Sequence, residues 1–180
     1  MKKTILFCMC LLLVAVPLTA QEKADKPAEG EMSNYGPPPP LDDAWTKWML
    51  GEWQGTTKSP MGESTDWMKC ELGLGGQFQM LTYKSQSAMG EFTGLGAFTF
   101  VGDEVRAYWM DSWRDMSEGK GKLEGNRMVM EWEGRMGHHT RTIERVSDDK
   151  MVIIAKWTSP DGQPMQARTE LTRKKAMGGK

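Results

Sequence analysis

The two histidines of the 180-residue sequence, His138 and His139, are adjacent, and Met128, Met130 and Met136 lie close to them. Imidazole and thioether groups are donors that suit soft copper. Successive residues of a regular strand point to opposite faces, so the two histidines are not expected to bind one ion together. Structural zinc needs more Cys and His than the sequence provides. Copper binding is therefore one hypothesis for these histidines, and an exposed hairpin without a ligand is the other.

Catalytic motifs with a recognisable spacing are missing from the sequence. It contains no nucleophile elbow, no phosphate-cradling glycine loop and no zinc-binding helix motif. The carboxylates Asp111, Asp115, Glu131 and Glu133 lack a spacing that pairs them for acid–base chemistry. We predict no enzymatic activity and no bound cofactor. Cys70 is expected to be a buried small apolar residue rather than a reactive thiol.

Residues 1–20 have the organisation of a secretory signal peptide. Lys2 and Lys3 precede an apolar run, and a small residue, Ala20, ends the segment before Gln21. The apolar run is too short for a membrane span of about 20 residues. We predict export to the periplasm or the extracellular space, with cleavage near Ala20 and no integral membrane contact afterwards.

Charge and cysteine content exclude further classes. The sequence has 23 basic residues, two of them in the leader, against 24 acidic ones. A chain with this balance does not favour nucleic acid as a partner, because phosphate contacts need clustered Lys and Arg. Cys8 and Cys10 belong to the leader, so Cys70 alone remains and cannot form an intramolecular disulfide.

The remaining chain divides into a linker, one domain and a tail. Residues 21–40 contain few large apolar side chains and end in four prolines, which is typical of a disordered spacer. We place the folded domain at residues 41–174 and a flexible tail at 175–180. Within residues 41–50, the apolar side chains recur at helical spacing, with Asp42 and Asp43 in the first turn and Gly51 after the end. This pattern predicts a short helix whose tryptophan face covers one end of the rest of the domain.

From Gly51 onward, short segments with alternating apolar and polar residues are separated by turn residues. Segments joined so tightly form a meander, and a meander of about ten strands avoids exposed edges by closing. The predicted fold is therefore all-β, a closed antiparallel up-and-down barrel. The ten predicted strands are Glu52–Lys58, Thr65–Leu72, Gln77–Lys84, Glu91–Phe100, Glu104–Ser112, Met116–Leu123, Arg127–Trp132, His138–Val146, Met151–Thr158 and Met165–Arg173.

Alternation also predicts which side chains face the interior. The inward sets are Met128, Met130 and Trp132 in one strand, Met151, Ile153, Ala155 and Trp157 in another, and Met68, Cys70 and Leu72 in a third. The strand with His139 is ambiguous, because both of its faces carry polar groups. If His139 and Arg141 face inward, the interior contains a guanidinium that must meet an anion, a carboxylate or water.

The segment Gly51-Glu52-Trp53 resembles the G-x-W motif of calycins, the group of lipocalins, fatty-acid-binding proteins and nitrobindin-like barrels. In those families the tryptophan closes the barrel base and stacks on a basic side chain of the last strand. The resemblance implies Arg173 as the partner of Trp53, with Arg168 in reserve. A second lipocalin motif, T-D-Y followed by a basic residue, is not visible. In a nitrobindin-like barrel, haem would need one inward histidine as axial ligand, which adds haem to copper as a hypothesis for His138 or His139.

A closer similarity covers about residues 41–174. Segments 72–78, 94–96, 108–112 and 145–149 look like those of a bacterial family of exported proteins catalogued only as a domain of unknown function. The resemblance implies a calycin-like barrel and no established activity, so no catalytic residues are carried over.

Alternation assigns several Met and Trp side chains to the interior of the barrel, and this has two interpretations. Met fills irregular gaps beside aromatic rings, so a filled barrel acting as a structural or interaction module is one alternative. A barrel of this size can also hold one small ligand, which favours binding of a small hydrophobic or amphipathic molecule. An inward Arg141 or Arg168 then anchors a ligand carboxylate. The candidate cavity residues are Trp109, Met128, Met130, Trp132, Arg141, Ile153, Trp157 and Arg168.

Overall fold

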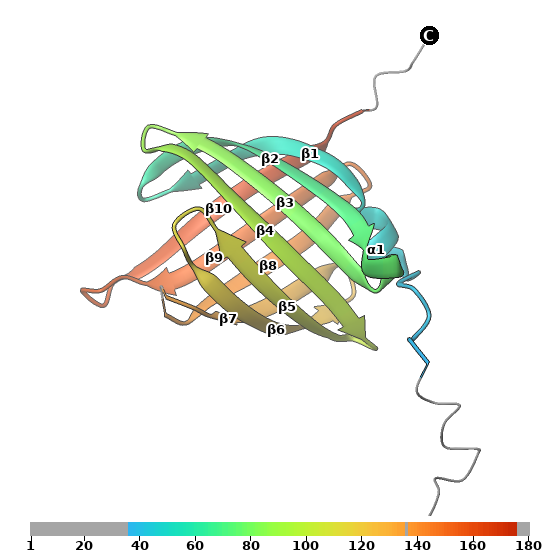
Figure 1. The fold of residues 1–180 in the computed structure, drawn as a ribbon. Coiled ribbons are helices and arrows are strands. Elements are labelled where there is room, and N and C mark those ends of the chain that lie inside the picture. Colours follow the sequence, from blue (N-terminus) through green and yellow to red (C-terminus); the bar gives the residue numbers. More distant parts are fainter. Residues whose placement is uncertain (1–35, 136, 176–180) are drawn as a thin grey trace, which may run out of the picture. The chain divides into compact units, whose positions relative to one another are not determined.

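The computed structural model describes residues 36–135 and 137–175 (Figure 1). The predicted leader, most of the predicted linker and tail, and Met136 lie outside these residues. Ten strands form the folded domain, and each predicted strand corresponds to one of them. They are β1 (Gly51–Ser59), β2 (Gly62–Gly73), β3 (Phe78–Ser87), β4 (Gly90–Val101), β5 (Glu104–Asp111), β6 (Met116–Glu124), β7 (Arg127–Glu133), β8 (His139–Ser147), β9 (Lys150–Thr158) and β10 (Pro164–Arg173).

The sheet is a closed antiparallel up-and-down barrel, as predicted. Each strand pairs with the next one along the chain, and β1 pairs with β10 to close the ring. The closing register runs from Trp53 opposite Arg173 to Lys58 opposite Arg168. Closure leaves no strand with an unpaired edge, which is what a long meander of tightly connected strands requires.

Helix α1 (Ala44–Met49) precedes the barrel and is shorter than the sequence pattern predicted. Asp43 is not in the first turn but caps the helix, and its Oδ1 accepts a hydrogen bond of 2.8 Å from the backbone N–H of Thr46. Six residues would not hold a helix alone in water, so docking must stabilise it. The Trp48 indole supplies part of that docking by donating to the backbone carbonyls of Ser147 and Asp148, each at 3.2 Å.

Side chains fill the end of the barrel that α1 covers. Three tryptophans pack together there: the ring centroid of Trp48 lies 4.9 Å from that of Trp45 and 5.4 Å from that of Trp53. Met128 and Met151 lie fully buried next to them in the same core. The inward set predicted for β7 is confirmed, because Met128, Met130 and Trp132 are all buried. The set predicted for β9 is confirmed in another way: Met151 is buried, and Ile153, Ala155 and Trp157 line the open part of the interior.

The inward assignment of Leu72 was wrong. Met68 and Cys70, on the same strand, are buried as predicted, but Leu72 is 40% exposed. It lies one residue before the end of β2, where the strand has passed the packed core. Among the described residues, we find no helix with the length and apolarity to cross a membrane.

Candidate ligand-binding cavity

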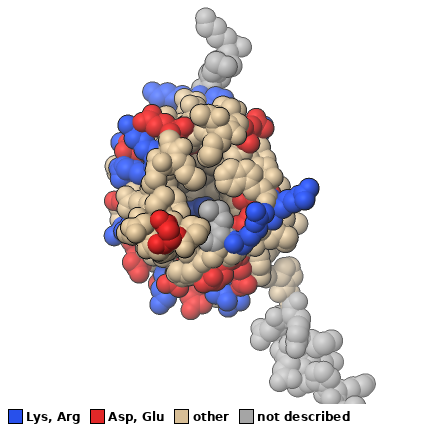
Figure 2. Space-filling view, turned by 90° about the vertical axis from the view of Figure 1, so that its left-hand side faces the viewer, with Lys and Arg blue, Asp and Glu red and all other residues tan. Residues whose placement is uncertain are grey.

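The half of the barrel away from α1 is hollow and encloses a cavity of about 310 Å³. Figure 2 looks onto this end of the molecule, where the surface is indented. Buried apolar side chains line the inner end, next to the packed core, and the hairpin turns that join β1 to β2, β3 to β4 and β5 to β6 contribute the exposed side chains of Met61, Met89 and Trp113. The inner apolar residues are Met68, Leu81, Phe98, Met130 and Ile143.

Glycines on β4 and β6 make room for the two large rings of the cavity wall. A Cβ atom at Gly94 would clash with the six-membered ring of Trp109, and one at Gly119 would lie 2.8 Å from Cδ2 of Trp132. The backbone at Gly94 and Gly96 lies against the indole ring of Trp109. These positions therefore set the shape of the cavity.

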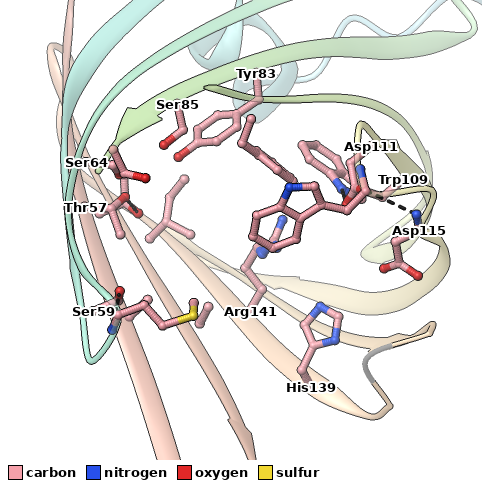
Figure 3. Close-up of a pocket in the computed structure, with 18 of the residues that line it drawn as sticks. Thr57, Ser59, Ser64, Tyr83, Ser85, Trp109, Asp111, Asp115, His139 and Arg141 are labelled. Carbon is pink, nitrogen blue, oxygen red and sulfur yellow. Dashed lines mark hydrogen bonds between the residues drawn. The ribbon is translucent and has the colours of Figure 1, made fainter. Parts of the chain in front are cut away.

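Arg141, on β8, points into the cavity (Figure 3) and lies close to the rings of both Trp109 and Trp132. Its guanidinium carbon is 5.6 Å from the ring centroid of Trp109 and 5.6 Å from that of Trp132. Burial lowers the pKa of Arg141, although the electrostatic interactions with Tyr83 and Asp111 oppose this change. No carboxylate of the described residues lies within ion-pair distance of this guanidinium. Arginine stays charged in proteins, so the cavity contains a cation flanked by aromatic rings.

The two histidines lie on opposite faces of the barrel, as strand geometry predicts. His139 lines the cavity, and its ring stacks on Trp132 at 6.3 Å between centroids and 8° between planes. Burial and the positive charge of Arg141 lower the pKa of His139. His138 points away, with Nδ1 2.8 Å from Glu133 Oε1. Within residues 36–135 and 137–175, no three His, Cys, Asp or Glu side chains are grouped to hold a metal ion.

The carboxylates near the mouth hold the β5–β6 loop in place. Asp111 accepts hydrogen bonds from the Trp109 indole at 3.2 Å and from the backbone N–H of Trp113 at 2.9 Å. Asp115 accepts from the Ser117 hydroxyl at 2.7 Å and from the Arg135 backbone N–H at 2.8 Å. Burial would raise the pKa of Asp115, but these hydrogen bonds outweigh it and the pKa is lowered. The loop therefore positions Trp109 in the wall.

Opposite this loop, a cluster of hydroxyl groups surrounds the buried carboxylate of Asp66, which is 2% exposed. The Thr57 hydroxyl donates to Asp66 Oδ2 at 2.6 Å, and the Ser64 hydroxyl donates to Oδ1 at 2.9 Å. The Thr169 hydroxyl lies 2.5 Å from that of Thr57. This cluster was not predicted from the sequence. Extending the alternation of β2 back from Met68 would have placed Asp66 and Ser64 inward.

Six of the eight candidate cavity residues line the cavity, and two do not. Met128 is fully buried in the core near α1. Arg168 was wrongly included, because Ala167 and Thr169 are the inward residues of β10 and Arg168 lies between them on the outer face. There its Nε is 3.0 Å from Oε1 of Glu170. The six cavity-lining residues are Trp109, Met130, Trp132, Arg141, Ile153 and Trp157.

The pair expected from the G-x-W resemblance is in contact. The Arg173 guanidinium carbon lies 4.2 Å from the ring centroid of Trp53, and Arg173 also donates to the carbonyls of Leu50 and Trp48. Trp53 itself donates to the carbonyl of Met49 at 2.9 Å. This contact closes the end of the barrel opposite the cavity mouth.

Solved structures that share this architecture include the following two. The S-type phycobiliprotein lyase CPES from Guillardia theta aligns with a TM-score of 0.55 and 7% identity, over 73% of this chain and 92% of the lyase. Rv2717c from M. tuberculosis aligns with a TM-score of 0.57 and 14% identity, over 71% of this chain and 94% of Rv2717c. The fold is a calycin-like barrel. No protein-family model and no curated protein matches the chain, and identities this low show a common fold alone.

Proposed function

We propose that this barrel binds a small amphipathic molecule that carries an anionic group. The observation that supports the proposal best is the position of Arg141 inside an aromatic-lined cavity, with no described carboxylate as an ion-pair partner. A charge removed from water is costly unless a counter-charge and hydrogen bonds compensate it. A ligand carboxylate or sulfonate supplies both, because the guanidinium can donate two parallel hydrogen bonds to it.

The rest of the lining defines the body of this ligand. Phe98, Met130, Ile143 and Ile153 provide apolar surface at the inner end, and Met side chains adapt their shape to what they contact. A cavity with mostly apolar walls and a few polar groups is typical of small-molecule sites. The shared fold with a phycobiliprotein lyase is compatible with a small-molecule partner.

A titration with naphthalene derivatives tests the proposal. The 2-naphthoate anion and the neutral 2-naphthamide have nearly the same shape, so their affinities for the protein differ mainly through the charge. We expect 2-naphthoate to bind about tenfold tighter, the size of one charge-assisted hydrogen bond. The variant Arg141→Gln should lose this preference. Arg168→Gln, which changes an arginine of the outer face, should keep it.

Two results would contradict the proposal. One is the absence of binding by either naphthalene derivative. The other is a preference for 2-naphthoate that Arg141→Gln leaves unchanged, provided that circular dichroism shows the variant to be folded.

The haem hypothesis has one observation in its favour, the ring of His139 in the cavity wall. An absorption scan of the protein purified from its own host distinguishes the two functions. A Soret band that disappears in His139→Gln and persists in His138→Gln would show that the cavity binds haem and not the proposed anionic ligand. Copper is less favoured, because the proposed donors are not brought together: Met128 is buried in the core and His138 contacts Glu133 outside the cavity.

We also propose that the protein is exported and belongs to the bacterial family that its motifs resemble. The charged start, the apolar run and Ala20 support export. Sequencing the amino terminus of the protein recovered from its host tests this. A mature chain that begins near Gln21 is expected, and an intact residue 1–20 segment on an intracellular protein would contradict it.

A further inference from the structure

The hydroxyl cluster around Asp66 faces the same cavity as Arg141, and its hydrogen bonds have a direction. A Ser or Thr hydroxyl has one proton to donate and two lone pairs to accept with. The hydroxyls of Ser64 and Thr57 both donate to Asp66, so neither has a proton left for another partner. The carboxylate needs these donors, because at 2% exposure it receives almost no water.

Thr169 completes the chain of donations. Its hydroxyl is 2.5 Å from that of Thr57, and either atom could be the donor on distance alone. Because the Thr57 proton already lies toward Asp66, Thr169 must donate to Thr57. The protons of all three hydroxyls therefore point along the network toward Asp66, so these three side chains can offer only lone pairs to the cavity.

Figure 3 shows this wall on one side of the cavity, with Thr57 and Ser64 across from Asp111 and His139 and with Arg141 between them. Thr57, Ser64 and Thr169 line the cavity, whereas Asp66 lies behind them. Arg141 offers only donors, whereas the hydroxyl wall formed by Thr57, Ser64 and Thr169 offers acceptors.

We propose that the ligand carries a hydroxyl or N–H group that donates a hydrogen bond to the hydroxyl wall, in addition to the anionic group held by Arg141. This inference rests on the proposed function and narrows it to amphipathic acids with a hydrogen-bond donor on the apolar body. Fatty acids without a polar substituent fall outside this class.

Two matched probes test the inference. Both 6-hydroxy-2-naphthoate and 6-methoxy-2-naphthoate have the carboxylate and the ring, but only the hydroxy acid can donate from position 6. We expect the hydroxy acid to bind about three- to tenfold tighter, the range of one net hydrogen bond. Ser64→Ala should reduce this ratio. Thr65→Ala, which removes an exposed hydroxyl of the outer face on the same strand, should leave the ratio unchanged.

Asp66→Asn examines the direction of the network itself. The side-chain amide of this variant can donate a hydrogen bond to one of the hydroxyls, and that hydroxyl can then turn its own proton toward the cavity. The ratio of the two affinities should therefore fall close to one. If this variant fails to fold, Ser64→Ala and Thr169→Val still decide the result. Equal binding of the two acids to the unmodified protein, with dependence on Arg141 retained, would overturn this inference and leave the proposed function standing.

Two further outcomes are decisive. A preference for the hydroxy acid that survives in the Ser64, Asp66 and Thr169 variants would place the donor contact elsewhere and overturn the assignment. Failure of both acids to bind would refute the proposed function and this inference with it.

Discussion

Arg173 and Trp53 join the last strand of the barrel to the first, and the same arginine holds helix α1. The guanidinium carbon lies 4.2 Å from the ring centroid, while two of its nitrogens donate hydrogen bonds of 2.6 Å to the carbonyls of Leu50 and Trp48. These carbonyls lie at the end of the helix, where intrahelical donors are missing. One side chain therefore stabilises the packing of the ring, the strand closure and the helix end.

The variant Trp53→Ala is expected to lower the free energy of unfolding by about 3–5 kcal/mol, because it removes a fully buried aromatic side chain. Arg173→Ala should cost about 2–4 kcal/mol through the lost hydrogen bonds to carbonyls and the lost ring contact. Urea unfolding followed by circular dichroism measures both. Arg168→Ala is the control and should change the free energy by less than about 0.5 kcal/mol, since its ion pair is on the surface. A neutral Trp53 variant would contradict the structural role of the G-x-W motif.

Stability should depend on pH through His139. Burial and the charge of Arg141 lower its pKa in the folded protein from 6.5, its ordinary value. As pH falls below about 6.5, the unfolded chain therefore takes up this proton before the folded protein does. The free energy of unfolding falls in that window and levels off once the pH is below the folded pKa.

Urea midpoints at pH 7.5 and pH 5.5 measure this dependence. The decrease between the two values should be smaller in His139→Gln than in the unmodified protein. His138→Gln, on the outer face, should retain the full decrease. Equal decreases in both variants would show that carboxylates, not His139, cause the change.

Most of the barrel could be predicted because its strands are bounded by turn residues. Where one face is buried, as in β7 with Met128 and Trp132, alternation also gave the correct side. Alternation was not extended to Asp66 and Ser64, because polar residues in a strand are normally assigned to the outer face. The assignment of Arg168 to the cavity was wrong because it rested on residue type and not on alternation.

Two features were not obtained from the sequence. The first is the start of α1, because Asp43 was placed in the first turn, whereas its side chain bonds to Thr46 and caps the helix. The open half of the barrel depends on which rings fill the interior, and this is decided by contacts between strands, such as Gly94 with Trp109. The residues that make such contacts are distant in the sequence, so the contacts cannot be recognised until the register of the strands is known.

Gly94→Ala should damage both the packing and the cavity. The added methyl group would overlap with the Trp109 ring, so the ring must shift. We expect a loss of about 1–3 kcal/mol in the free energy of unfolding, typical of an overpacked core, and weaker 2-naphthoate binding. Leu95→Ala, at the neighbouring exposed position, should affect neither measurement. Unchanged binding by a stable Gly94→Ala variant would mean that Trp109 does not form part of the site.

The thiol of Cys70 should be unreactive in the folded protein. It is 2% exposed, and burial, with a contribution from the charge of Glu71, raises its pKa to about 12. Only the thiolate reacts rapidly with iodoacetamide, and at pH 8 almost none is present. Peptide mass spectrometry, which separates Cys70 from Cys8 and Cys10, should therefore find Cys70 unmodified in buffer and fully modified in urea. The variant Thr65→Cys places a thiol on the outer face of the same strand and should react in buffer within minutes. Equal labelling of both positions in the folded protein would show that the β2 side of the barrel opens to solvent, against the packing of Cys70 in the core.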